Sequence, residues 1–183
     1  QNSGKAEILN KWDLRYDKNS VGATVFEMLY KEILIEVFGS KCFGKDVMKY
    51  LIENTGIVVD YYLNFDKILL DDGYEKSEMW FDGDRSEVLK LIINRFIENL
   101  DIEKIKPWGE VNTVTMNNIF FDGSLPKFMG FDYGPIPVEG SRATVVQGMV
   151  YKTGGRVTTF CPSWRFITEM NHDFAYTALA GGV

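Results

Sequence analysis

The sequence predicts an α+β fold, with helices in its first half and antiparallel strands in its second half. Before Pro107 the apolar residues recur at helical spacing, whereas after it they alternate at the two-residue spacing of strands. Helices followed by strands are typical of α+β organisation. With 183 residues, 45% of them hydrophobic and 14% aromatic, the chain can bury a substantial core. We therefore predict a helical subdomain over residues 1–106 and a β-sheet portion over residues 107–183.

Composition excludes several classes of partner and cofactor. The chain carries 26 acidic and 20 basic residues, and no basic block interleaves with aromatic side chains, so we do not expect it to bind nucleic acid. No apolar run is long enough to span a bilayer, and we expect no membrane partner. Cys42 and Cys161 lack metal-ligand spacing; we interpret both as buried thiols, with a disulfide as the alternative. His172 lies in a polar turn, and we expect no metal or cofactor.

Two helices are predicted before residue 40. Lys5–Leu14 favours a short helix, and the polar turn that follows places Ser20 as the N-cap of the next one. From Val21 the apolar residues recur every third or fourth position, which predicts a mostly buried helix that ends at Gly39. Glu27 and Lys31 are spaced for an ion pair on the remaining polar stripe of this helix.

The rest of the helical half contains three further segments with helical patterns. Lys45–Asn54 favours a helix, and Ile57–Phe65 suits a helix better than a strand without excluding the latter. Asp84 and Glu87 have the spacing of a capping box, which opens a helix to Leu100. The acidic clusters at 71–73 and 82–84 lack the ligand spacing of a calcium loop, and we interpret them as solvated turns.

After Pro107 the pattern favours strands separated by irregular segments. Trp108–Gly109 predicts a break, and residues 111–116 predict a strand. Four glycines and three prolines between residues 123 and 140 predict a long irregular loop over 122–141. Alternation returns over Arg142–Tyr151, and two β-prone runs then flank the break at residues 161–163.

The second of these runs contains the two candidate site residues, Arg165 and Glu169. They lie on the same face of the predicted strand, with apolar Ile167 between them. Their Cα atoms are roughly 13 Å apart at about 3.3 Å per residue, so each needs a partner from another strand or another part of the protein. The charges mark either a half-solvated sheet edge or a pair that braces a functional site.

No complete active site is recognisable from the residues themselves. The sequence contains no phosphate-binding glycine loop, no set of metal-ligating cysteines and histidines, and no nucleophile elbow. Ser163 has no base near it in the sequence and is interpreted as a structural hydroxyl.

Several segments do resemble, in the same order, motifs in the β chain of the penicillin amidase family. These segments are Trp12-Asp13, Asn19–Phe26, Pro107–Asn112, Gly134–Ser141 with Thr144-Val145, Pro162–Met170 and Ala180–Gly182. The resemblance implies an N-terminal nucleophile hydrolase with an αββα sandwich, made as a precursor that cleaves itself into two chains. It implies acyl transfer from an amide, with the first β-chain residue as nucleophile and an oxyanion held by an Asn side chain and backbone N–H groups.

None of those reacting groups matches a position of this chain, and Gln1 has no nucleophilic side chain. The resemblance therefore implies the C-terminal part of a β chain, inactive by itself, from an enzyme that cleaves penicillins or N-acyl compounds. Its partners would be the α chain and the first part of the β chain, and the isolated segment would self-associate. Met116-Asn117-Asn118 stands where the family often carries a histidine.

In this reading Glu169 accepts hydrogen bonds near the nucleophile end of the site, and Arg165 anchors an adjacent loop. The alternative interpretation is a non-catalytic folded module whose exposed faces bind a partner.

Overall fold

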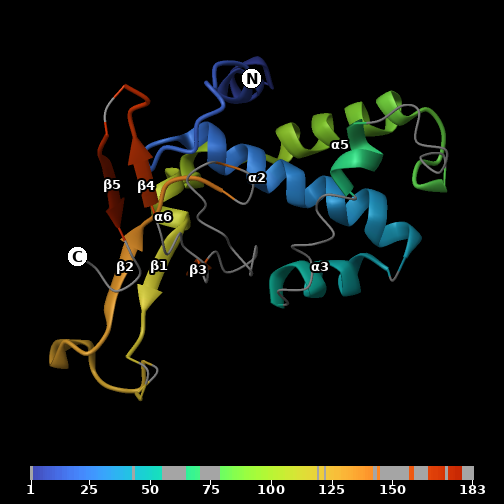
Figure 1. The fold of residues 1–183 in the computed structure, drawn as a ribbon. Helices are drawn as coiled ribbons and strands as arrows, with labels where there is room; N and C mark the ends of the chain where they lie inside the picture. The colour runs from blue at the N-terminus through green and yellow to red at the C-terminus, as the bar shows by residue number, and fades with distance from the viewer. Residues whose placement is uncertain are drawn as a thin grey trace.

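The computed structural model confirms the mixed α+β architecture. It describes residues 2–42, 44–54, 65–70, 79–118, 120–121, 123–141, 144, 157–158, 165–171 and 173–178. The elements are α1 (Asn2–Asn10), α2 (Val21–Leu34), η1 (Ile35–Gly39), α3 (Lys45–Asn54), α5 (Arg85–Asn99), η3 (Ile102–Lys104), α6 (Trp108–Val111), β1 (Thr113–Met116), η4 (Lys127–Met129), β2 (Tyr133–Pro137), β3 (Val157–Thr158), β4 (Arg165–Thr168) and β5 (Ala175–Ala178). In Figure 1 the long helices lie on one side and the paired strands on the other.

Helix α2 is the central element of the helical half. Ser20 caps it as predicted, because its Oγ accepts a hydrogen bond from the Ala23 N–H at 3.1 Å. The predicted stop at Gly39 is wrong, since the helix continues through the π-helical turn η1 and residues 40–41. A Cβ atom on Gly39 would lie only 3.1 Å from the Lys45 Cα and the Met48 Cβ. This glycine therefore permits close packing of α3, and the left-handed break comes at Gly44, with φ 88°.

The hydrophobic core lies where α2 and η1 meet α3, α5 and the helical residues 65–70. Its buried members are Tyr30, Leu34, Val37, Phe38, Met48, Ile52, Ile68, Phe81 and Ile92. The predicted helices over Lys45–Asn54 and from Arg85 are confirmed, and Asp84 caps the latter by accepting from the Glu87 N–H at 3.0 Å. The predicted segment Ile57–Phe65 lies outside the described residues except for Phe65, which is helical.

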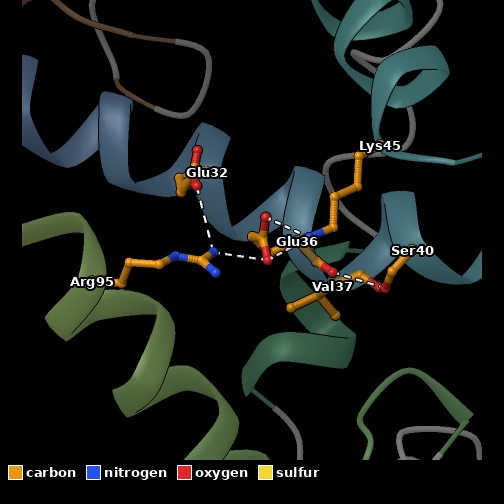
Figure 2. Close-up of polar contacts among 6 residues, drawn as sticks. All are labelled: Glu32, Glu36, Val37, Ser40, Lys45 and Arg95. Atoms are coloured by element: carbon orange, nitrogen blue, oxygen red, sulfur yellow. Dashed lines mark hydrogen bonds and ion pairs between the residues drawn. The ribbon is translucent and has the colours of Figure 1, made fainter. Parts of the chain in front are cut away.

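Charged residues connect α3 and α5 to the helix formed by α2 and η1, at the edge of this core. Figure 2 shows Arg95 of α5 reaching Glu32 and Glu36, while Lys45 of α3 approaches Glu36 from the other side. The Arg95 Nη2 atom is 2.8 Å from Glu36 Oε2 and 3.6 Å from Glu32 Oε1, and Lys45 Nζ is 2.8 Å from Glu36 Oε1. Partial burial alone would raise the pKa of Glu36, but hydrogen bonds and positive charge from Arg95 and Lys45 lower it overall.

Replacing Glu36 with glutamine is expected to reduce the free energy of unfolding by about 0.5–1 kcal/mol at neutral pH, because its cationic partners are half exposed. The folded-state pKa of Glu36 lies below its ordinary value of 4.5. Its stabilising contribution is therefore complete above that value and is lost as the pH falls through the folded-state pKa. The difference between wild type and variant should shrink in acid, as measured by urea unfolding across this pH range.

The matched control for this pH experiment is Glu98→Gln, which alters an exposed carboxylate on α5. Its effect on the free energy of unfolding should be small at every pH. A Glu36→Gln effect that stayed constant or grew on acidification would contradict the assigned pKa direction.

The strands form two small sheets. The first has the order β2-β1-β3, and the second pairs β4 with β5. The β1–β2 and β4–β5 pairs are antiparallel as predicted, whereas β1 and β3 are parallel. Two local predictions are wrong: Trp108–Gly109 begins the helical turn α6, and the predicted loop over 122–141 contains strand β2. Residues 142–151 lie outside the described residues except for Thr144.

The N-terminal segment and Cys42 also differ from expectation. Helix α1 ends at Asn10 rather than Leu14, and Trp12 instead packs over Gly22, where a Cβ atom would lie 2.5 Å from the Trp12 Cγ. Cys42 lies in a turn after the helix and is exposed rather than buried, and partial burial still raises the pKa of its thiol. Cys161 and His172 lie outside the described residues.

Within the described part of the chain, no helix is long and apolar enough to cross a membrane.

Candidate functional site

Four separate segments of the chain converge on one cluster of hydrogen-bonded residues beside the start of α2. We call this cluster the motif junction and define it as Tyr16, Glu27, Trp108, Asn112 and Ser141. It joins the turn before α2, the helix itself, α6 and the segment that follows β2. The junction therefore links the helical and strand-containing parts of the chain. The division of the chain into subdomains at Pro107 stays a prediction.

Glu27 is the charged centre of the motif junction. It is only 7% exposed, although the sequence pattern assigned it to a polar stripe with Lys31. Its Oε1 atom accepts two hydrogen bonds, from the Tyr16 hydroxyl at 2.9 Å and from the Ser141 hydroxyl at 2.9 Å. Burying a carboxylate is costly unless it is hydrogen-bonded, and these hydroxyls supply such bonds. Glu27 is therefore buried by tertiary contacts, because Tyr16 and Ser141 come from outside the helix.

Trp108 and Asn112 hold the strand side of the junction. Trp108 is fully buried, its backbone N–H donates to the Ser20 carbonyl at 2.9 Å, and its indole Nε1 donates to the Gly140 carbonyl at 2.9 Å. Asn112 is also fully buried, and its Nδ2 donates to the Val138 carbonyl at 3.0 Å. These bonds fix the chain that leaves β2 against α6, and so place Ser141 next to Glu27.

Close packing of rings and backbone completes the junction. The Tyr16 ring contacts the Trp108 ring edge-on at a centroid distance of 5.3 Å, and it meets the Trp12 ring at 5.4 Å. A Cβ atom on Gly109 would lie 2.6 Å from the Lys18 Cβ, and the Gly109 N–H donates to the Lys18 carbonyl at 2.7 Å. Glycine is therefore required at position 109 for α6 to approach the turn before α2.

The contacts of the junction hold four segments of the chain together beside a hollow. This hollow of about 540 Å³ is lined by Tyr16, Glu27 and Ser141 together with apolar side chains of α2 and α5. The Ser141 hydroxyl donates to the Glu27 carboxylate, which faces this hollow as well. No group of residues suited to hold a metal ion occurs among those described.

The candidate residues Arg165 and Glu169 lie at and just beyond the two ends of strand β4. Arg165 begins β4 and Glu169 follows its last residue, so the structure does not include Glu169 in the strand. Glu169 is exposed, and so are its apolar neighbours: Phe166 and Ile167 are each 53% exposed. The side chain of Arg165 lies outside the described residues. The structure thus places Arg165 in β4 and Glu169 directly after it, without assigning either a role.

The motif junction was not predicted from the sequence as a site. Trp108, Asn112 and Ser141 belong to segments that resemble the penicillin amidase family, whereas Tyr16 and Glu27 lie just outside such segments. Neither Tyr16 nor Glu27 stands out in the helical pattern, because the contacts that define their role reach up to 114 residues along the chain.

The family model described as penicillin amidase matches residues 1–183, the whole of the chain. The chain therefore belongs to the penicillin amidase family, whose name denotes hydrolysis of an amide. No curated protein matches the chain.

Proposed function

We propose that this chain is a supporting part of an amide hydrolase that cleaves the linear amide of penicillins or of related N-acyl compounds. The observation that carries the proposal is the family match over all 183 residues. In this proposal the chain forms the C-terminal part of the β chain within an αββα sandwich. The nucleophile comes from an earlier part of the precursor, and this segment alone is inactive.

The proposed reaction is acyl transfer in two stages. A nucleophile at a free chain N-terminus attacks the amide carbonyl, with its own α-amino group as the base. Hydrogen-bond donors stabilise the tetrahedral oxyanion, the amine leaves, and water then hydrolyses the acyl-enzyme. The contribution of the present chain is to hold the layers that carry these groups, and the motif junction joins four of its segments.

The exposed apolar side chains of the second sheet support a larger assembly. Phe166, Ile167, Met170, Phe174 and Tyr176 are all exposed on or beside β4 and β5. Clustered apolar surface and open strand edges are normally covered by other protein. We propose that the rest of the precursor, the α chain and the first part of the β chain, covers them.

Glu169 is proposed as a positioning residue in that assembly, accepting hydrogen bonds near the nucleophile, with Arg165 anchoring a neighbouring loop. Glu169→Gln in the full-length protein is then expected to slow self-cleavage or to lower kcat by about tenfold or more, since hydrogen bonds to a charged group are worth about 1.5–3 kcal/mol. Hydrolysis of a chromogenic phenylacetyl amide measures turnover, and gel analysis of the precursor measures cleavage.

The control for Glu169 is Asp173→Asn, which alters another exposed carboxylate between β4 and β5. It should leave both rates close to those of the wild type. A Glu169→Gln protein that matures and turns over at the wild-type rate would remove Glu169 from the proposed site.

The second candidate function is a non-catalytic interaction module, favoured by the same exposed apolar side chains. The two proposals differ in the segment that precedes this chain in the full-length protein. A serine, cysteine or threonine that becomes a chain N-terminus after self-cleavage supports the hydrolase, and N-terminal sequencing of the mature chains detects it.

A further inference from the structure

Residues 81–84 connect the hydrophobic core to the start of α5, and we call them the 81–84 link. Phe81, at its first position, belongs to the core and is only 5% exposed. Asp84, at its last position, caps α5 with its side chain. Asp82 and Gly83, which lie between them, are both exposed and belong to neither a helix nor a strand. The link is therefore fixed at both ends and open to water in its middle.

The Asp82 carboxylate is free to change its orientation. Its side chain is 85% exposed, and its Oδ1 atom forms an ion pair with Lys41 Nζ. An ion pair at such exposure contributes little to stability, because water competes for both charges. The carboxylate can therefore leave Lys41 and rotate towards the backbone that follows it.

Gly83 presents an unhindered backbone nitrogen next to that carboxylate. Its φ of 122° lies in the region that favours glycine. A Cβ atom at this position would meet nothing within 4 Å beyond the chain neighbours, so the surrounding space is open. The Gly83 N–H donates no hydrogen bond to a described residue. The nitrogen is thus neither shielded by a side chain nor held by a partner.

We propose that Asp82 is a site of spontaneous modification, at which aspartate rearranges to isoaspartate through a succinimide. The Gly83 nitrogen attacks the Cγ atom of the protonated Asp82 carboxyl. A C–N bond forms, the bond from Cγ to the hydroxyl oxygen breaks, and the hydroxyl leaves as water with the proton of the nitrogen. A water molecule then opens the ring at the main-chain carbonyl of Asp82. The composition of the chain is unchanged, and water is the only other reactant.

This rearrangement alters the way in which α5 begins. The chain of the product continues through the side-chain carbons of residue 82, which adds one carbon atom to the backbone of the 81–84 link. Because Phe81 is packed in the core and Asp84 is exposed, Asp84 is the end that can move. Its side chain then loses the hydrogen bond that it accepts from the Glu87 N–H at 3.0 Å. The inference rests on this link and not on the proposed amide hydrolysis.

The test is incubation of the full-length protein at neutral pH in water enriched in heavy oxygen, followed by digestion in ordinary water and mass spectrometry. Ring opening places one heavy oxygen atom in residue 82, and electron-transfer fragmentation distinguishes isoaspartate from aspartate. The peptide that contains Asp82 should gain both several times faster than the peptides that contain Asp101 and Asp132. Those two aspartates precede an isoleucine and a tyrosine, whose side chains hinder attack by the backbone nitrogen.

Equal rates of isoaspartate formation at Asp82, Asp101 and Asp132, or no isoaspartate at residue 82, would overturn the proposal. The Asp-Gly pairs at 72–73 and 122–123 include residues outside the described part of the chain. Peptide mapping measures those pairs separately, so their rearrangement cannot be mistaken for that of Asp82.

Asp82→Glu separates the rearrangement from other changes during incubation. Glutamate keeps a carboxylate for Lys41 but closes a larger ring far more slowly, so the variant should form no rearranged product at position 82. Hydrogen exchange then reports on the start of α5. The Glu87 amide should exchange faster in the incubated wild type than in the fresh protein, and at an unchanged rate in the variant. A rearranged wild type with undiminished protection at Glu87 would overturn the inferred effect on α5.

Discussion

Replacing Trp108 with alanine is expected to lower the free energy of unfolding of this chain by about 3–5 kcal/mol, the range found for large aromatic truncations in packed interiors. Trp108 is fully buried, packs against the Tyr16 ring and donates its indole N–H to the Gly140 carbonyl. Alanine leaves a cavity and deprives that buried carbonyl of this donor. Urea unfolding followed by circular dichroism measures the change.

Two comparison variants separate the causes of the Trp108 effect. Trp108→Phe keeps most of the apolar contact but loses the indole donor, and should cost about 1–3 kcal/mol. Phe128→Ala truncates a ring that is 89% exposed and should change stability by less than about 0.5 kcal/mol. If Trp108→Ala cost no more than Phe128→Ala, the junction would not be the structural connection described here.

Replacing Glu27 with alanine is expected to cost about 3 kcal/mol or more at neutral pH. The substitution removes the shared acceptor of two hydroxyls, those of Tyr16 and Ser141, at a position where Glu27 is only 7% exposed. Each buried donor left without its acceptor costs about 1–3 kcal/mol. Glu27→Gln keeps a side-chain oxygen at the same place and should cost less, as measured by the same urea unfolding.

A double-mutant cycle with Tyr16→Phe tests the coupling directly. The two substitutions remove the same hydrogen bond, so their combined cost should fall short of the sum of the separate costs by about 1 kcal/mol or more. Glu139→Ala, which alters an exposed carboxylate of the same segment as Ser141, is the matched control. Strict additivity of Glu27→Ala and Tyr16→Phe would show that the junction contributes no cooperative stabilisation.

Local sequence signals predicted the helices well. Ser20 and Asp84 cap their helices because a short polar side chain before an apolar run satisfies backbone N–H groups within three residues. The α3 and α5 helices follow from spacing alone, since an apolar face every three or four residues must turn towards a core. Such features depend only on residues that are close together in the sequence, so they can be recognised without the structure.

The errors in the predicted fold arise from contacts between distant segments. Glycine is typical of a helix end, but close packing against α3 keeps Gly39 within the helix. Glu27 has the spacing of a surface residue, but Tyr16 and Ser141 bury it. Strand β2 contains glycine and proline, which normally interrupt strands, and pairing with β1 stabilises it. None of these partners is evident from local pattern.

Only part of the candidate site could be predicted from the sequence. Alternation placed Arg165 in a strand, and the β4–β5 pairing agrees with that placement. The role of Arg165 and Glu169 depends on protein that lies beyond this chain in the proposed assembly, so neither pattern nor packing within the chain tests it. The motif junction, by contrast, is formed from described residues and could be recognised only once four segments were brought together in space.

The most direct measurement of the central claim compares the full-length protein with the isolated 183-residue chain in hydrolysis of a chromogenic phenylacetyl amide. We expect the full-length protein to release the chromophore and the isolated chain to release none above the uncatalysed rate, because the reacting groups come from an earlier part of the precursor. Turnover by the isolated chain would contradict this division of roles, and an inactive full-length protein that fails to cleave itself would contradict the proposed hydrolase.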